Sequence, residues 1–171
     1  MDVLSSNPIQ DDAVNQGTPL VSVSMPVYNA ERYIAEAINS ILSQTYQNFE
    51  LIIVDDGSTD RTREIVESFD DPRIIKVYSD RNRGLITTRN RIAQIARGKY
   101  LALLDADDCA FPDRLALQVQ FLESNQADLC GADHWTLNQV TGQLKASKQR
   151  HSNSDIHALL SVCSPVCNPA M

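Results

Sequence analysis

The sequence predicts an α/β fold, in which a mostly parallel sheet is flanked by helices. Short apolar runs alternate along the chain with longer segments whose apolar side chains recur at helical spacing. Continuous apolar runs are typical of strands buried on both faces of a parallel sheet, and the intervening helices provide the crossovers that parallel strands need. Two of the runs end directly in aspartates, at the edge where open α/β sheets bind their ligands.

Strands and helices are expected to alternate through the first part of the chain. Proline cannot continue a central ladder, so Pro26 is expected to stop the first strand. Asn29 is expected to cap the first helix, and Gly98 is expected to end the third. The strand at 100–104 is nearly all apolar and is expected to be fully buried. The expected strands cover 20–25, 49–54, 74–78 and 100–104, and the expected helices cover 30–44, 60–69, 85–96 and 111–123.

The character of the sequence changes after Asn125. Residues 127–137 and 144–147 are predicted strands on either side of a hairpin turn at 138–142, and 155–162 is a predicted short helix. The start of the chain is polar and lacks a recognisable element. The sequence therefore divides into a disordered lead-in over 1–19, an α/β half over 20–126, and the beginning of a second half over 127–171.

Composition limits the classes of function. The 171 residues suit one domain with a sizeable core. A net charge of −7, from 15 basic and 22 acidic residues, argues against a nucleic-acid partner. The chain has no apolar run of the roughly 18 residues that a transmembrane helix needs, and it does not start with an export signal. We therefore expect a cytoplasmic protein, either free or at the inner face of the membrane.

The 4 cysteines are expected to be reduced thiols, because the chain starts without an export signal. Cys163 and Cys167 lie close in sequence to His151 and His157, which raises the question of a zinc site. Their spacing matches no common pattern of zinc ligands, so we favour reduced thiols over a metal site.

Aspartates follow two of the predicted strands, at positions 55–56 and 105–107. Because the carboxyl ends of parallel strands meet at one edge, we expect both groups and the Tyr28 ring to line one crevice. Clustered carboxylates repel one another unless a cation or hydrogen-bond donors hold them. Mg²⁺ and Mn²⁺ take one or two carboxylates together with phosphate oxygens. The sequence therefore predicts a nucleoside diphosphate bound through a metal, while Asp108 either joins the cluster or caps the next helix.

Four arginines flank Gly84, at the start of the helix predicted over 85–96. A helix N-terminus and arginine side chains both favour anions, whereas a solvated helix face is the alternative interpretation. We favour anion binding for Arg89 and a solvated position for Arg91. The other two arginines are Arg81 and Arg83.

Several stretches together resemble the family 2 glycosyltransferases. They occur in the family's order and spacing between residues 20 and 124. Each stretch alone would be a weak signal, whereas the set is specific. The stretches are 23–29, 40–45, 55–60, 82–85 with 89–90, and 104–108.

The resemblance implies a GT-A fold, with a Rossmann-like, nucleotide-sugar-binding half at 20–126 and the beginning of an acceptor-binding half at 127–171. It implies an enzyme that transfers a sugar, with inversion, from a nucleotide-diphosphate sugar to a hydroxyl of a saccharide or lipid-linked acceptor. A UDP-sugar is the expected donor. Mn²⁺ or Mg²⁺ is the expected cofactor, and polysaccharide or cell-envelope biosynthesis is the expected setting.

The resemblance also implies roles for individual residues, by motif match. Asp56 would hydrogen-bond the base, Asp105 would lie at the ribose, and Asp107 would bind the metal. Asp105, Ala106 and Asp107 together form the family's Asp-any-Asp signature. The other residues expected to line the nucleotide-sugar site are Pro26, Val27 and Tyr28 at the base, with Gly84, Arg89 and Ala106 beside the nucleotide.

The catalytic base is not named by this resemblance, because the family's general-base motif is expected beyond Met171. Asp133 is a carboxylate in the second half, but it does not match the family position. The chain is therefore expected to be part of a longer enzyme or a truncated, non-catalytic nucleotide-binding module. A third alternative is a receiver-type phosphoacceptor domain. Such domains place their acidic pair on the first strand, whereas here a strand and a helix precede Asp55.

Overall fold

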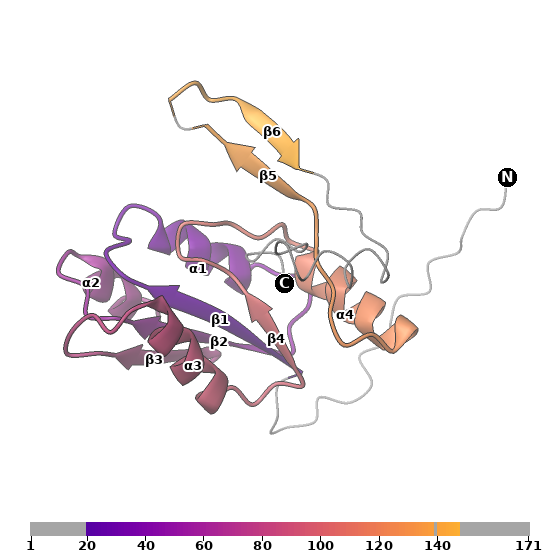
Figure 1. Ribbon diagram of the computed structural model, residues 1–171, viewed down its shortest axis with the longest axis horizontal. Helices are drawn as coiled ribbons and strands as arrows, with labels where there is room; N and C mark the ends of the chain where they lie inside the picture. The colour runs from indigo at the N-terminus through magenta and orange to yellow at the C-terminus, as the bar shows by residue number, and fades with distance from the viewer. Residues whose placement is uncertain (1–19, 139, 148–171) are drawn as a thin grey trace, which may run out of the picture.

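The computed structural model describes residues 20–138 and 140–147, which form two sheets (Figure 1). The larger sheet has 4 parallel strands in the order β3-β2-β1-β4, and the smaller pairs β5 antiparallel with β6. The predicted α/β fold is confirmed. The predicted lead-in, the helix at 155–162 and the cysteines and histidines between 151 and 167 lie outside the described residues. The elements are β1 Val21–Val27, α1 Ile34–Leu42, β2 Phe49–Asp55, α2 Thr62–Glu67, β3 Ile74–Tyr78, α3 Leu85–Ile95, β4 Tyr100–Leu103, α4 Arg114–Asn125, β5 His134–Leu137 and β6 Leu144–Ser147.

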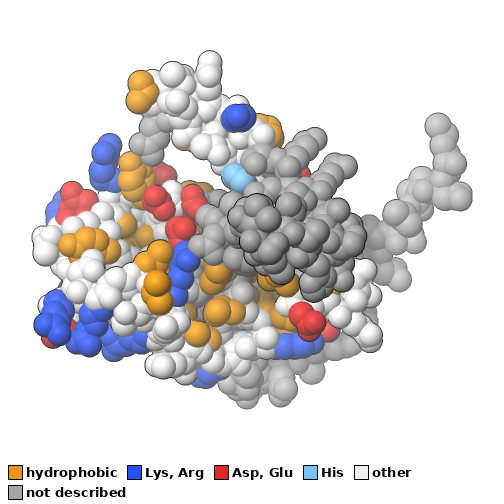
Figure 2. Space-filling model, viewed as in Figure 1, with side chains coloured by type: hydrophobic (Ala, Val, Ile, Leu, Met, Phe, Trp, Pro, Cys, Tyr) orange, Lys and Arg blue, Asp and Glu red, His pale blue; other side chains and the backbone are white. Residues whose placement is uncertain are grey.

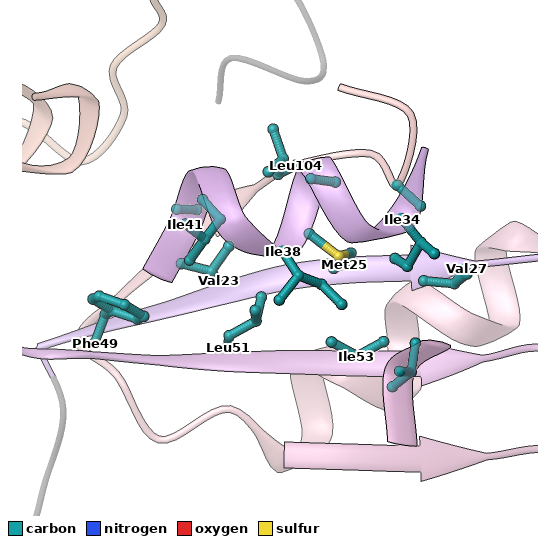
Figure 3. Packing of buried hydrophobic residues seen from close by; sticks show 14 of the residues in the cluster. Val23, Met25, Val27, Ile34, Ile38, Ile41, Phe49, Leu51, Ile53 and Leu104 are labelled. Carbon is teal, nitrogen blue, oxygen red and sulfur yellow. The ribbon is translucent and has the colours of Figure 1, made fainter. Parts of the chain in front are cut away.

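Helices cover both faces of the larger sheet. α1, α2 and α4 contribute buried residues to the core on one face, whereas α3 covers the other face through Ile92. Figure 3 shows Met25 of β1 and Leu51 of β2 beside Ile38 of α1, and none of these three side chains is exposed. This packing holds the strand ends in fixed positions relative to one another. No described helix is long and apolar enough to cross a membrane.

Pro26 lies inside β1, so the prediction that it stops the strand is wrong. The backbone N–H and C=O groups of the even-numbered residues in β1 point toward β4. This is shown by the Ser24 carbonyl, which accepts a hydrogen bond from the Leu104 N–H at 3.0 Å. The register of β4 on β1 ends at Ser24 and Leu103. The backbone nitrogen of Pro26 therefore lies beyond the end of β4. Because no described strand is paired there, the lack of an N–H at Pro26 costs no hydrogen bond of the sheet.

β4 is an edge strand of the larger sheet, and the prediction that it is fully buried is wrong. Among the described strands it pairs only with β1, and Leu101 is 43% exposed. The Arg114 guanidinium donates a hydrogen bond of 2.8 Å to the Leu103 carbonyl and so covers part of this edge. An apolar run indicates a strand, but the burial of that strand depends on its position in the sheet. The run itself carries no information about the strand order.

α1 starts later than predicted, and Asn29 does not cap it. The helix begins at Ile34, after a turn, with Tyr33 at the N-cap and no side-chain hydrogen bond to the first turn. Asn29 instead has a positive φ of 50°. Asparagine tolerates this left-handed conformation better than most residues, so the chain can turn sharply as it leaves β1.

Gly98 does not end α3 by a left-handed turn. The helix ends at Ile95, and Ala96 is already extended. A Cβ atom at Gly98 would lie only 2.5 Å from the Ser22 backbone nitrogen. Glycine is therefore required at this position by the close approach of the chain to the start of β1.

β5 and β6 form the predicted hairpin, although β5 begins only at His134. The register pairs His134 with Ser147. The Asn138 side-chain oxygen accepts hydrogen bonds from the backbone N–H groups of Val140 and Thr141, both at 3.0 Å. This Asx-type turn explains the reversal of the chain at the predicted place.

Candidate functional site

The carboxyl ends of the 4 parallel strands meet at one edge of the larger sheet, as expected for a ligand site. A loop leaves each strand there, and we call these the first to fourth strand-end loops. All of the predicted site residues lie on these loops or immediately beside them. The loops span 28–33, 56–61, 79–84 and 104–113.

Hydrogen bonds join the first and second strand-end loops into a structure that we call the loop clasp, made of residues 29–31 and 58–62. The Asn29 N–H donates to the Ser58 hydroxyl at 2.9 Å, and the Thr59 N–H donates to Asn29 Oδ1 at 2.8 Å. The clasp fixes the chain that directly follows Tyr28. Its other bonds run from Ala30 N to Thr62 Oγ1 (2.8 Å), from Glu31 N to Asp60 Oδ2 (3.1 Å) and from Arg61 N to Glu31 Oε2 (3.0 Å).

The three residues expected at the base pocket differ in exposure. Pro26 and Val27 are buried in β1, whereas the Tyr28 residue is 48% exposed. An aromatic ring at this edge offers a flat surface on which a base can stack. Of the three, only Tyr28 presents a side chain that a ligand could reach.

Asp55 and Asp56 are both buried, and both are held by hydrogen bonds. Asp55 accepts from the Ser58 N–H at 2.9 Å and from the Ser58 hydroxyl at 2.6 Å. Asp56 reaches the third strand-end loop, where it accepts from the Arg83 N–H at 3.0 Å and from the Gly84 N–H at 2.8 Å. The Asp56 carboxylate therefore positions the loop that opens α3.

The second and third strand-end loops also approach each other through Gly57. This residue has a φ of 77°, and a Cβ atom on it would lie 2.6 Å from the Arg81 carbonyl carbon. Both the conformation and the lack of space require glycine. The tight turn predicted at this position is confirmed.

Arg89 joins α3 to the fourth strand-end loop. Its Nη2 lies 2.9 Å from Asp105 Oδ1, and both side chains are partly buried. Anion binding by Arg89 stays a prediction, because its observed partner is a carboxylate of the protein. Arg91 is exposed, with its Nη1 3.4 Å from the Ser79 hydroxyl. Hydrogen bonds thus link the first three strand-end loops through Asn29 and Asp56, and Arg89 links α3, which follows the third loop, to the fourth.

The fourth strand-end loop carries the acidic cluster. The Ala106 side chain is buried, Asp107 is exposed, and Asp105 and Asp108 are half-buried. Burial raises the pKa of Asp108, and the charges of Asp107 and Asp105 raise it further, whereas His134 lowers it. Figure 2 shows acidic side chains, drawn in red, gathered on one face of the molecule.

A divalent metal fits this cluster only if the protein and a bound diphosphate coordinate it together. In the part of the chain that the structure describes, no three histidine, cysteine or acidic side chains are arranged to hold a metal ion. Mg²⁺ and Mn²⁺ commonly take one or two carboxylates and complete their shell with phosphate oxygens and water. The mutual repulsion that raises the pKa of Asp108 would be relieved by a cation beside Asp107. The donor set therefore fits a metal that binds together with a diphosphate.

Comparison with known proteins places this arrangement in a family. Residues 22–163 match the family model described as glycosyl transferase family 2. The chain belongs to glycosyl transferase family 2. It is 44% identical over 106 residues to TuaG of Bacillus subtilis, which is named for glycosyl transfer in teichuronic acid biosynthesis. The match covers 61% of this chain and 42% of TuaG, so the chain spans less than half of that relative.

Solved structures of family 2 enzymes share the fold. A solved fragment of S. aureus TarS, residues 1–349, is 32% identical, with a TM-score of 0.60, over 63% of this chain and 33% of that fragment. TarS has been solved with UDP and with UDP-GlcNAc. The mannosyltransferase PcManGT of Pyrobaculum calidifontis, solved with GDP-mannose and Mn²⁺, is 29% identical with a TM-score of 0.57, over 68% of this chain and 35% of that protein. These likenesses confirm the GT-A type of fold and argue against the receiver-domain alternative.

Sequence reasoning missed several residues of this family 2 site. Asn29 and Ser58 hold the loop clasp, yet the sequence suggested only turn and capping roles for residues of this kind. His134 lies on the hairpin and was not singled out. A positive φ at Asn29 could have been suspected from an asparagine directly after a strand, but its partners could not.

Proposed function

We propose that the chain is the donor-binding part of an inverting, metal-dependent glycosyltransferase that uses a nucleotide-diphosphate sugar. The observation that carries the proposal is that Tyr28, Asp56, Arg89 and the acidic cluster lie along one edge of the sheet, where Asp56 holds the Arg83 backbone and Arg89 pairs with Asp105. The complexes of TarS with UDP and UDP-GlcNAc support a uridine nucleotide as the donor. The PcManGT complex supports Mn²⁺ as a cofactor.

Each predicted residue receives a role along the nucleotide. Tyr28 stacks on the base beside Pro26 and Val27, and Asp56 accepts a hydrogen bond from the base while it holds the Arg83–Gly84 backbone. Asp105, oriented by Arg89, accepts from the ribose, and Ala106 anchors the loop from inside. Gly84 and Arg89 border the phosphates. Asp107 binds Mn²⁺ or Mg²⁺ between the protein and the diphosphate.

The chemistry follows from the charge that develops on the leaving group. Departure of a nucleoside diphosphate adds negative charge to its phosphate oxygens, and a bound divalent cation withdraws that charge as a Lewis acid. Asp107 and Asp105 fix where the diphosphate lies. Inversion requires a separate carboxylate on the opposite face of the sugar to take the proton of the acceptor hydroxyl. We assign this general base to none of the described residues.

The acceptor is proposed to be a saccharide or a lipid-linked saccharide. The likeness to TuaG, named for teichuronic acid biosynthesis, supports a cell-envelope polysaccharide as the setting. The span of less than half of TuaG keeps a second candidate function open, in which this chain binds donor and metal without turnover. A hydrolysis and transfer assay with the bound donor tests the second candidate, because release of the nucleoside diphosphate by this chain would contradict it.

A panel of nucleotide-sugars with and without Mn²⁺ tests the proposal directly. Ligands that bind the folded state raise the unfolding temperature, and the stabilisation grows with the logarithm of the ligand concentration divided by its Kd. We expect stabilisation by UDP and by at least one UDP-sugar, increased by Mn²⁺. A protein that no nucleoside diphosphate stabilises, in the presence or absence of the metal, would contradict the proposed function.

Asp107→Asn is predicted to abolish the Mn²⁺-dependent part of nucleotide binding. The side chain is exposed, so the variant should fold and unfold like the wild type. The neutral amide removes the charge that a divalent cation needs. Isothermal titration with UDP, in Mn²⁺ and in EDTA, measures the effect, with the exposed Asp70→Asn as the matched control. Equal Mn²⁺-dependent affinities in wild type and Asp107→Asn would rule out Asp107 as the metal ligand.

A further inference from the structure

A polar side chain is buried at the end of α1. Gln44 follows the C-cap of this helix, and the residue is only 1% exposed. It belongs to the stretch 40–45, which resembles the family 2 glycosyltransferases but contributes no residue to the proposed nucleotide contacts. Burial of a carboxamide is costly unless its donors and its acceptor find partners. The partners of Gln44 therefore indicate what the residue does.

The Gln44 carboxamide holds the last part of the fourth strand-end loop. Its Nε2 donates to the Phe111 carbonyl at 2.7 Å, and its Oε1 accepts from the Leu115 N–H at 3.0 Å. Nε2 also donates to the Ser40 carbonyl at 3.0 Å. Both N–H groups and the oxygen of the carboxamide are therefore in use. The side chain joins the end of α1 to the passage from the loop into α4.

Ser40 of α1 holds the same loop closer to the acidic cluster. Its hydroxyl accepts a hydrogen bond from the Ala110 N–H at 3.1 Å, and Ala110 lies two residues beyond Asp108. On the other side of the cluster, the Leu104 N–H donates to the Ser24 carbonyl of β1 at 3.0 Å. All three aspartates of the cluster thus lie on a short span that is fixed at both ends.

The span between these two anchors, residues 105–109, is also ordered internally. The Asp108 N–H donates to the Asp105 carbonyl at 3.1 Å, and the Ala106 side chain is buried. Groups that are already fixed in a binding geometry lose less conformational entropy when a ligand arrives. The anchors from α1 therefore hold the carboxylates of this loop ready to bind a cation.

We propose that Ser40 and Gln44 are positioning residues, which hold Asp107 where it binds the divalent metal by anchoring the fourth strand-end loop to α1. The inference rests on the proposed function and deepens it. A metal ion accepts only a narrow range of ligand distances, so a loop that is released at one end should bind Mn²⁺ more weakly. Asp105 is held separately by Arg89, and the proposed base contacts lie on other loops. The anchor should therefore affect the metal-dependent part of binding.

The test is titration of UDP into Ser40→Ala, in Mn²⁺ and in EDTA, or of GDP if the wild type prefers it. Alanine is favourable in a helix, so the variant should fold. We expect binding in Mn²⁺ to weaken by about three- to tenfold, because one anchoring hydrogen bond is lost. Binding in EDTA should stay within about twofold of the wild type. Ser43→Ala is the matched control, because this exposed hydroxyl bonds only the Ser40 carbonyl of its own helix end, at 3.3 Å.

Ser40→Thr provides the rescue, because threonine keeps the hydroxyl. In a helix this hydroxyl can bond a carbonyl one turn earlier, as Ser40 does with Ala37 at 2.7 Å. We expect Ser40→Thr to bind UDP in Mn²⁺ like the wild type. Gln44→Ala should show a larger loss than Ser40→Ala, because it removes two hydrogen bonds to the loop. If Gln44→Ala does not fold, the Ser40 variants decide the question.

Equal losses in Mn²⁺ and in EDTA would overturn the inference, because they would indicate a general structural role. Unchanged affinity of Ser40→Ala in Mn²⁺ would overturn it too, even if the variant unfolds at a lower temperature. A Ser40→Thr protein that folds normally and binds as weakly as Ser40→Ala would have the same consequence. Failure of the proposed function is recognised separately, in the wild type, as the absence of Mn²⁺-dependent nucleotide binding.

Discussion

At the scale of single residues, Asp56 has two roles, one structural and one proposed for ligand binding. Its buried carboxylate accepts hydrogen bonds from the Arg83 and Gly84 backbone and is proposed to accept another from the base. A carboxylate has about four acceptor positions, so the two tasks are compatible. Asp56→Ala is predicted to weaken UDP binding by about tenfold or more, with or without Mn²⁺, because it removes the base contact and releases the third strand-end loop.

Titration of UDP into Asp56→Ala, in Mn²⁺ and in EDTA, measures this effect. Asp80→Asn on the same loop is the control, because the exposed Asp80–Arg83 ion pair faces solvent and should leave affinity unchanged. An Asp56→Ala protein that binds UDP as tightly as the wild type would argue against both tasks. A loss seen only with Mn²⁺ would point to the metal site instead.

The sequence identified the acidic residues at this scale but not their partners. Asp56, Asp105 and Asp107 were predicted from the ends of apolar runs, and they do lie along one edge of the sheet. The donors to Asp56 are backbone N–H groups, which every residue except proline provides. The residue types at positions 83 and 84 therefore do not predict the contact with Asp56. Arg89 was singled out because it is a charged residue near a predicted helix start, but its contact with Asp105 was not predicted.

At the scale of elements, the loop clasp fixes the direction in which the chain leaves β1. Asn29 contributes twice, through its left-handed backbone and through Oδ1, which accepts from the Thr59 N–H. Asn29→Gly keeps the conformation but loses the acceptor, whereas Asn29→Asp keeps both. We predict that Asn29→Gly weakens UDP binding about three- to tenfold, in line with the loss of one hydrogen bond that positions Tyr28, and that Asn29→Asp binds almost normally.

Calorimetric titration and thermal unfolding of both variants separate positioning from stability. Asn29→Gly should lose affinity for UDP while its affinity for inorganic pyrophosphate, which has no base, stays the same. Equal losses for UDP and pyrophosphate would mean that the clasp supports the whole site and does not specifically orient Tyr28. Normal UDP affinity in Asn29→Gly would mean that the hydrogen bond to Thr59 is not needed for binding.

Periodicity predicted the elements well, but two of their boundaries and one burial pattern depended on tertiary structure. Pro26 is accommodated in β1 because β4 is too short to reach it. Leu101 is exposed because β4 lies at the edge of the sheet. Gly98 is required by the approach of the chain to Ser22, a residue far away in sequence. Each difference arises from a neighbour in space, and local sequence patterns carry no information about that neighbour.

At the scale of the whole molecule, the two ends of the larger sheet have different polar networks. The carboxyl end holds the strand-end loops and their proposed ligand site. At the amino end, Glu50 is buried and accepts hydrogen bonds from the Ser22 hydroxyl at 2.7 Å and from Arg97, whose Nη2 lies at 2.6 Å. Ser22 in turn accepts from the Gly98 N–H at 2.8 Å. This network ties β1 and β2 to the connection between α3 and β4, and it lies away from the ligand edge.

The amino-end network should therefore affect stability and leave nucleotide binding unchanged. Burial raises the pKa of Glu50, but hydrogen bonds from Ser22 and Arg97, with the Arg97 charge, outweigh it and hold the pKa below its ordinary value of 4.5. A lowered pKa means that the ionised carboxylate stabilises the fold above about pH 4.5 and that this contribution disappears as the pH falls through the lowered pKa. Glu50→Gln removes the charge at every pH.

We predict that Glu50→Gln lowers the free energy of unfolding by about 1–3 kcal/mol at pH 7, because charge-assisted hydrogen bonds of a buried group are lost. The difference from the wild type should shrink as the pH falls below 4.5, since the wild-type carboxyl then also becomes neutral. Urea unfolding at pH 7 and at several acidic values measures this, and UDP titration at pH 7 should show unchanged affinity. A stability difference that persists undiminished in acid would show that the shape of the side chain, and not its charge, holds this end of the sheet.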